Sequence, residues 1–253
     1  MVEIINPKKI GIALDVDGTL VDTNFECYQR TKEAWEEKYN QEFPLSYEQF
    51  SSFRPMVARA EDYFSFSKML IENNGILPKN AKDLNEKYLE DPDVSELKQL
   101  FYDMRKAKIA KDRKGWVEEN KVYDGVPEMM EDLGKTGWDI FVITSKNRDA
   151  VSEILSYHGL DSNIGKVYDK DDGKRPEQFR KASEERGLEM KRIIPYDDLL
   201  KQLLAARELG MIPVAAPQGY GIIEEIKENG FLIAWPQKFV EVAENVIKRW
   251  GSE

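Results

Sequence analysis

The sequence is poor in cysteine, which forms the disulfides of many secreted proteins, and has no excess of the basic residues that bind nucleic acids. It has one cysteine and one histidine among 253 residues, and no surplus of positive charge. An internal disulfide needs two cysteines, and Cys27 is the only one, so no internal disulfide can form and we expect a reducing compartment. The 37 Lys and Arg residues against 47 Asp and Glu leave a net charge of −10, which repels phosphate backbones and acidic membrane surfaces.

Long apolar runs are also missing from the sequence. No stretch approaches the roughly 18 consecutive apolar residues that span a bilayer, and the N-terminus lacks the basic and apolar parts of a signal peptide. We therefore expect a cytoplasmic protein, a monomer or a homodimer, with neither a membrane nor a nucleic acid as partner.

One short segment stands out, "IGIALDVDGTLVD" at residues 10–22. Its aliphatic residues predict a short buried strand that ends at Gly18 or earlier. Asp15 and Asp17 then lie at the carboxyl end of this strand, one residue apart and directly before a glycine and Thr19. The local pattern by itself is also compatible with a turn in which the aspartates cap the next element.

Helical and strand patterns alternate from Tyr123 onward. The predicted strands are "WDIFVITS", "RIIPY", "MIPVAA" and "FLIAW", separated by helices at 127–135, 148–158, 176–186, 199–209 and 222–228. Strands separated by single helices indicate right-handed crossovers and a mostly parallel sheet with helices on both faces. The predicted fold class is α/β, a three-layer Rossmann-like core that the first strand joins.

Residues 23–114 interrupt this alternation. The segments "FECYQRTKEAWEEKYN", "AEDYFSFSKMLIENN" and "DVSELKQLFYDMRKAKIAKD" read as amphipathic helices with no strand between them. The sequence thus predicts a core of residues 1–22 and 115–253 with an inserted helical domain at 23–114.

Polar residues follow several of the predicted strands. In an open α/β sheet such residues converge at one edge, where ligands bind; here they are Asp15, Asp17, Thr144, Ser145, Asp197 and Asp198, with Lys174 in a loop of the same series. Clustered carboxylates repel one another unless a cation neutralises them, and hard oxygen ligands suit Mg²⁺. A lysine in the same crevice suits a phosphoryl group.

Four motifs together resemble the haloacid dehalogenase-like hydrolase superfamily. They are "DVDGTLVD", "VITSKN", "GKRPEQF" and "YDD" followed by "AARELGM", and the late "APQGYG" is similar to a turn of phosphoglycolate phosphatase-type members. The resemblance covers the whole core, and the insertion sits where that family places a helical cap. It implies a phosphatase that hydrolyses a small phosphorylated substrate with Mg²⁺ through an aspartyl phosphate.

The resemblance also implies roles for individual residues. Asp15 would be the nucleophile and Asp17 the general acid and base, which favours phosphate chemistry over dehalogenation. Thr144, Ser145 and Lys174 would bind the phosphoryl group, and Asp15, Asp17, Asp197 and Asp198 would hold the metal. In the insertion, Arg54 and Arg59 are candidate ligands for an anionic substrate, as is Arg105.

Two motifs depart from the family pattern. Arg175 stands between Lys174 and Pro176, where the family's lysine commonly precedes proline directly, and Lys170 or Arg175 would supply the same charge. Gln202 stands where family members often have an acid, while Asp197 replaces a glycine and either takes over that acid's function or points away. A phosphomutase, or a metabolite-binding member with weakened turnover, remains an alternative reading.

Overall fold

The computed structural model describes residues 9–250 and divides the chain into two compact units. The core unit contains residues 9–22 and 121–250, and the helical unit contains residues 23–120. The second junction therefore lies at residue 120, six residues beyond the predicted boundary at 114. The difference arises because helix α6 (Arg113–Glu118) buries Trp116 and Val117 inside the helical unit.

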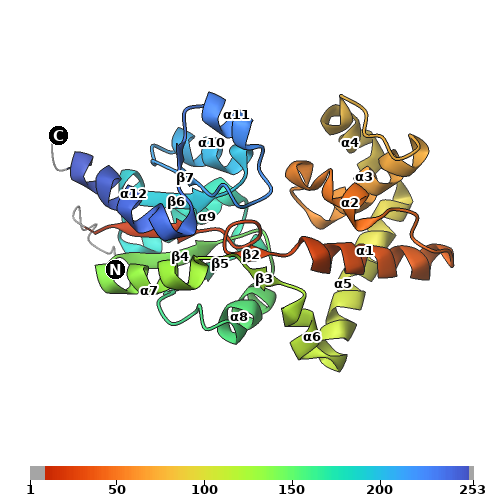
Figure 1. Cartoon of the computed structure of the whole chain (residues 1–253), viewed down its shortest axis with the longest axis horizontal. Coiled ribbons are helices and arrows are strands. Elements are labelled where there is room, and N and C mark those ends of the chain that lie inside the picture. The colour runs from red at the N-terminus through yellow and green to blue at the C-terminus, as the bar shows by residue number, and fades with distance from the viewer. Residues whose placement is uncertain (1–8, 251–253) are drawn as a thin grey trace. The chain divides into compact units, whose positions relative to one another are not determined.

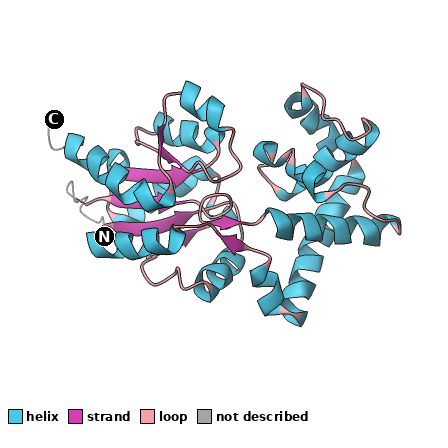
Figure 2. Cartoon of the chain, viewed as in Figure 1, coloured by secondary structure: helices cyan, strands magenta, loops and turns pink. Residues whose placement is uncertain are grey.

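The core unit is built on a sheet of six parallel strands (Figures 1 and 2). Their order is β5 (Val167–Tyr168), β4 (Asp139–Ile143), β1 (Gly11–Leu14), β6 (Ile193–Asp197), β7 (Val214–Ala215), β8 (Leu232–Ile233). Strand β1 pairs with both β4 and β6, Gly11 lying opposite Asp139 and Ile193. A strand covered on both faces reads as a continuous apolar run, which is why the first strand is evident from sequence.

Helices cover both faces of this sheet, as predicted. They are α7 (Val126–Thr136), α8 (Arg148–Tyr157), α9 (Arg175–Arg186), α10 (Leu200–Glu208), α11 (Ile223–Glu228) and α12 (Pro236–Trp250), with short 3₁₀ turns at Lys170–Asp172 and Met190–Arg192. Phe141 of β4 packs in one cluster with Phe179 of α9 and Ala206 of α10. On the opposite face, the centres of the Tyr196 ring and of the Phe239 ring on α12 are 4.2 Å apart. The three-layer α/β prediction is confirmed.

A small antiparallel ribbon lies where the chain leaves and re-enters the core unit. Strands β2 (Val21–Asp22) and β3 (Lys121–Val122) pair so that Asp22 lies opposite Lys121. Neither this ribbon nor β5 was predicted from sequence. Strands β7 and β8 are equally short but lie within apolar runs, whereas Val122 and Val167–Tyr168 have charged residues close by on both sides and give no such signal.

The helical unit, residues 23–120, contains helices and connecting loops and no strand. They are α1 (Asn24–Tyr39), α2 (Tyr47–Ser51), a 3₁₀ turn (Arg54–Met56), α3 (Ala60–Glu72), α4 (Ala81–Leu89), α5 (Pro92–Lys111) and α6. The three long predicted helices correspond to α1, α3 and α5. Buried aromatic rings form a core of its own, in which Phe50, Phe53, Phe66 and Phe101 are almost fully covered.

One buried carboxylate ties three of these helices together. Glu26 of α1 is fully buried and accepts hydrogen bonds from Arg105 of α5, at 2.8 Å from Nε and 2.5 Å from Nη2. The indole nitrogen of Trp116 in α6 donates to the same carboxylate at 3.1 Å. Arg105 is therefore held in an internal ion pair that joins α1 and α5. Its part in binding an anionic substrate stays a prediction.

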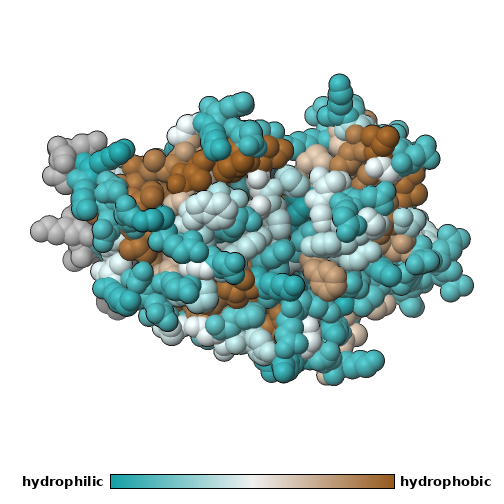
Figure 3. All heavy atoms as spheres, in the orientation of Figure 1, coloured by the Kyte–Doolittle hydropathy of each residue, from teal (hydrophilic) through white to brown (hydrophobic). Residues whose placement is uncertain are grey.

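The surface is rich in hydrophilic side chains, as expected for a sequence in which 33% of the residues are charged (Figure 3). Figure 3 shows hydrophilic side chains over much of the visible face, with hydrophobic patches between them. None of the helices within residues 9–250 is both long and apolar enough to cross a membrane.

Candidate active site

Asp15 directly follows strand β1 and is buried at its carboxyl end. Its backbone amide donates to the carbonyl of Tyr196 in β6 at 3.0 Å, so the sheet pairing continues to the aspartate itself. The chain then turns sharply, because the amides of Thr19, Leu20 and Val21 all donate to the carbonyl of Val16. The tight turn that follows is what presents both aspartates at the sheet edge.

Gly18 is required in this turn for two reasons. Its φ of +86° is one that side chains with a Cβ rarely adopt. A Cβ at this position would also clash with a carboxylate oxygen of Asp198. The "DVDGT" segment therefore lets the backbone approach a third aspartate closely.

Three buried carboxylates meet at the edge formed by β1 and β6. Oxygen atoms of Asp15, Asp197 and Asp198 lie within 4.8 Å of one another. Burial raises the pKa of Asp15 well above its usual value, Arg175 opposes this, and the neighbouring aspartates raise it further. Burial likewise raises the pKa of Asp197. A donor set of hard oxygen atoms with excess negative charge fits a divalent cation such as Mg²⁺.

Asp198 is fixed by the loop that follows β7. The backbone amide of Tyr220 donates to Asp198 Oδ2 at 2.7 Å, and Thr19 Oγ1 lies 3.5 Å from Oδ1. The side chain of Gln218 in the same loop donates to the carbonyl of Thr19 at 2.8 Å. The "APQGYG" segment thus joins the turn after β1 to the acidic cluster, a contact that sequence reasoning did not assign.

Arg175, at the start of α9, is the cation that reaches the carboxylates. Its Nη2 lies 3.0 Å from Asp15 Oδ1 and 3.3 Å from Asp197 Oδ2, and its Nη1 donates to the carbonyl of Ile143. The guanidinium side chain is only 9% exposed. Lys174, the residue predicted from sequence, is instead exposed one position earlier.

The loop after β4 presents Thr144 and Ser145. Thr144 is buried, its amide donates to the carbonyl of Tyr168 at 3.0 Å, and its hydroxyl accepts from the amide of Lys146 at 3.1 Å. Ser145 is exposed. Lys146 belongs to the "VITSKN" motif, but the sequence pattern predicted no role for it. Its ammonium lies 3.2 Å from Asp17 Oδ1.

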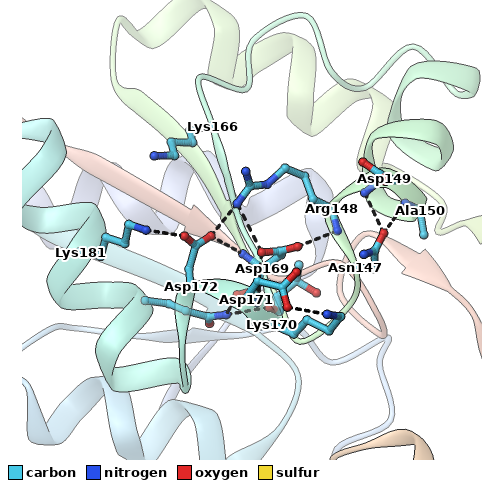
Figure 4. Close-up of polar contacts among 12 residues, drawn as sticks. Asn147, Arg148, Asp149, Ala150, Lys166, Asp169, Lys170, Asp171, Asp172 and Lys181 are labelled. Atoms are coloured by element: carbon cyan, nitrogen blue, oxygen red, sulfur yellow. Dashed lines mark hydrogen bonds and ion pairs between the residues drawn. The ribbon is translucent and has the colours of Figure 1, made fainter. Parts of the chain in front are cut away.

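A polar network behind this loop holds it against the loop after β5 (Figure 4). The Asp169 carboxylate accepts from the Arg148 amide at 2.9 Å, and the Arg148 guanidinium bridges Asp169 and Asp172 at 3.3 and 2.7 Å. The buried side chain of Gln178 donates to the carbonyls of both Thr144 and Asp169, at 2.9 and 2.6 Å. The position of Thr144 therefore depends on residues far away in the sequence.

A pocket of about 360 Å³ shares Arg175 with the acidic cluster, since this residue lines the pocket and contacts Asp15 and Asp197. Its lining combines three basic side chains of the core unit with one acidic and several neutral ones: Ser145, Lys170, Lys174, Arg175, Glu177, Gln178 and Gln202, with Gly173. Gln202 therefore faces this pocket, whereas Asp197 supplies the third carboxylate of the cluster. The Asp197 carboxylate thus lies with those of Asp15 and Asp198, and its taking over the function of the acid that Gln202 replaces stays a prediction.

The two arginines predicted to bind substrate lie in the helical unit. Arg54 is buried, with its guanidinium 5.7 Å from the centre of the Tyr63 ring. Arg59 is half exposed. Its Nε lies 3.5 Å from Asp62 Oδ1 and its Nη2 lies 3.4 Å from Glu86 Oε1. Their part in substrate binding stays a prediction.

Comparison with known proteins places the chain in a family. A 5'-nucleotidase of Pseudomonas aeruginosa is 29% identical over 115 residues, which cover 44% of this chain and 52% of the relative, so the match spans about half of that protein's length. A haloacid dehalogenase-like hydrolase from Streptococcus pneumoniae has a similar structure, with 16% identity, a TM-score of 0.68, and coverage of 93% of this chain and 98% of that one.

Two structures titled as predicted or putative phosphoglycolate phosphatases are also similar. The protein from Haemophilus somnus is 18% identical with a TM-score of 0.68, covering 93% of this chain and 98% of its own. The protein from Lactobacillus delbrueckii is 14% identical with a TM-score of 0.70, covering 95% and 99%. At these identities the likeness concerns the fold. The sequence pattern of the family itself matches residues 12–216, so this chain belongs to the haloacid dehalogenase-like hydrolases.

Proposed function

We propose that this protein is a Mg²⁺-dependent phosphatase that hydrolyses a small phosphorylated metabolite through an aspartyl-phosphate intermediate. The observation that carries the proposal is the ion pair between Asp15 and Arg175 within a cluster of three buried carboxylates. The family supports hydrolysis, and the names of the relatives, a 5'-nucleotidase and phosphoglycolate phosphatases, favour a phosphate monoester as substrate.

The reaction proceeds in two steps that share Asp15 and Asp17. In the first, an oxygen of Asp15 attacks phosphorus, the bond to the leaving oxygen breaks, and Asp17 gives that oxygen its proton. In the second, water attacks the phosphorus of the aspartyl phosphate and gives a proton to Asp17. The bond to Asp15 then breaks, its electron pair returns to the carboxylate, and inorganic phosphate leaves.

The remaining residues bind and orient. Arg175 holds Asp15 in place and offers positive charge to the phosphoryl oxygens, which Thr144, Ser145 and Lys174 also contact. The clustered carboxylates of Asp15, Asp197 and Asp198 would hold Mg²⁺, which when bound neutralises negative charge on the phosphoryl group. Asp17, also assigned to the metal from sequence, lies outside this cluster and keeps its carboxylate for proton transfer. The helical unit acts as a cap that excludes water and selects the substrate.

Hydrolysis of a generic aryl phosphate tests the proposal directly. The protein is assayed with Mg²⁺, with a chelator, and after Mg²⁺ is restored, and then against sugar phosphates, nucleotides and small phosphorylated acids. We expect release of inorganic phosphate that stops with chelator and returns with Mg²⁺. Isomerised sugar phosphates without free phosphate would indicate a phosphomutase, and tight binding without turnover would indicate a binding protein.

Replacing each of the two neighbouring basic residues, Arg175 and Lys174, by methionine should lower turnover to different extents. Arg175→Met removes the group that contacts Asp15, and we expect turnover to fall by roughly 10²–10³-fold, as for loss of a charge-stabilising donor. Lys174→Met removes an exposed ammonium, and we expect a fall of about fivefold or less. Steady-state kinetics with the aryl phosphate provides the comparison. A larger loss in the Lys174 variant would show that Lys174, and not Arg175, is the main cation for the phosphoryl group.

A further inference from the structure

Lys146 is a buried lysine whose role neither the sequence motif nor the family assignment explains. Only 4% of its side chain is exposed, although it carries an ammonium group. Within residues 9–250, the acceptor for this ammonium is Asp17 Oδ1, at 3.2 Å. Burying a charge costs several kcal/mol unless a partner compensates it, so the position of Lys146 depends on Asp17.

The contact uses one oxygen of Asp17 and leaves the other available. Asp17 Oδ1 lies against the ammonium, whereas Oδ2 accepts no hydrogen bond from the described residues. The amide of Lys146 is itself held by the hydroxyl of Thr144 at 3.1 Å. The loop after β4 thereby connects the predicted phosphate-binding residue to the predicted acid and base.

We propose that Lys146 is a positioning residue that orients the Asp17 carboxylate so that Oδ2 faces the reacting group. This inference rests on the proposed phosphatase function. Its effect should be greatest in the second step, where water attacks phosphorus, its proton passes to Asp17 Oδ2, and the bond to Asp15 breaks. An aryl leaving group needs little protonation, so the first step with an aryl phosphate should depend less on Lys146.

The two steps are separated by rapid mixing with an aryl phosphate. In Lys146→Met we expect a burst of the aryl product of about one equivalent per protein, followed by turnover roughly 10²-fold slower than in the unchanged protein. Intact-protein mass spectrometry of the quenched reaction should show phosphorylated protein. Lys146→Arg, which keeps the charge, should recover most of the turnover. Lys166→Met, which loses an ammonium paired with Glu185 elsewhere in the core unit, is the matched control.

Competition by inorganic phosphate distinguishes orientation of Asp17 from direct phosphate binding. We expect the inhibition constant in Lys146→Met to stay within about twofold of the unchanged value, because the loss lies in proton transfer. A parallel rise of that constant would show that Lys146 binds the phosphoryl group and would overturn the proposal. Normal turnover without a burst would overturn it as well.

A double-mutant cycle tests the pairing without any activity assay. The denaturant midpoints of Lys146→Gln, Asp17→Asn and the double variant should be non-additive, because both single changes break the same contact. Additive midpoints would contradict the inference. If the unchanged protein releases no product from any phosphate monoester, the proposed function fails first, and the cycle still decides whether Lys146 holds Asp17.

Discussion

Asp15→Asn is expected to reduce phosphate release by at least about 10³-fold, because the change removes the attacking carboxylate oxygen. The fold should survive. Asp15 lies among the carboxylates of Asp197 and Asp198, and an amide of similar shape removes a negative charge from that crowded site. Aryl phosphate hydrolysis measures the loss, and circular dichroism with thermal unfolding checks the fold.

Two comparisons sharpen this experiment. Asp132→Asn makes the same chemical change at an exposed position on α7 and should leave the rate unchanged. Asp17→Asn should slow alkyl phosphates more than aryl phosphates, because only the former need a proton on the leaving oxygen. If Asp15→Asn kept a rate within tenfold of the unchanged protein, the nucleophile would have to be another residue.

Glu26→Gln is expected to lower the free energy of unfolding by about 3–5 kcal/mol, the range for breaking a buried ion pair by removing one partner. Glu26 is fully covered, and Arg105 and Trp116 both donate to it, so the neutral amide leaves a largely buried guanidinium without its counter-charge. Chemical denaturation followed by far-UV circular dichroism provides the measurement, since the affected helices α1, α5 and α6 supply much of the signal.

The control for Glu26 is a charge removed from the surface of the same unit. Glu86 is 80% exposed beside Arg59, so Glu86→Gln should change stability by less than about 1 kcal/mol. The double variant Glu26→Leu with Arg105→Met removes both charges and should recover part of the loss. Equal effects of Glu26→Gln and Glu86→Gln would show that the buried pair contributes no more than a surface contact.

Local pattern was sufficient for most of the fold. The first strand was evident because it is buried on both faces, and α1, α3 and α5 because their apolar residues recur at helical spacing. Strand β5 and helices α2, α4 and α6 were missed; β5 is only Val167–Tyr168, which stands between Lys166 and Asp169 with no apolar run around it. The boundary at residue 120 differs from the predicted one because Trp116 is buried in the helical unit, where its indole donates to Glu26, far earlier in the chain.

The sequence by itself determined that an apolar strand ends in Asp15 and Asp17, that a glycine-containing turn follows, and that Asp197 and Asp198 end a second strand. Only the tertiary structure decided that Arg175, and not Lys174, contacts Asp15, and that a buried Lys146 contacts Asp17. Adjacent residues of one loop point in different directions, and a long side chain reaches whatever opposite charge lies within its length. Which neighbour is buried and paired is therefore set by strands and helices that meet only when the chain has folded.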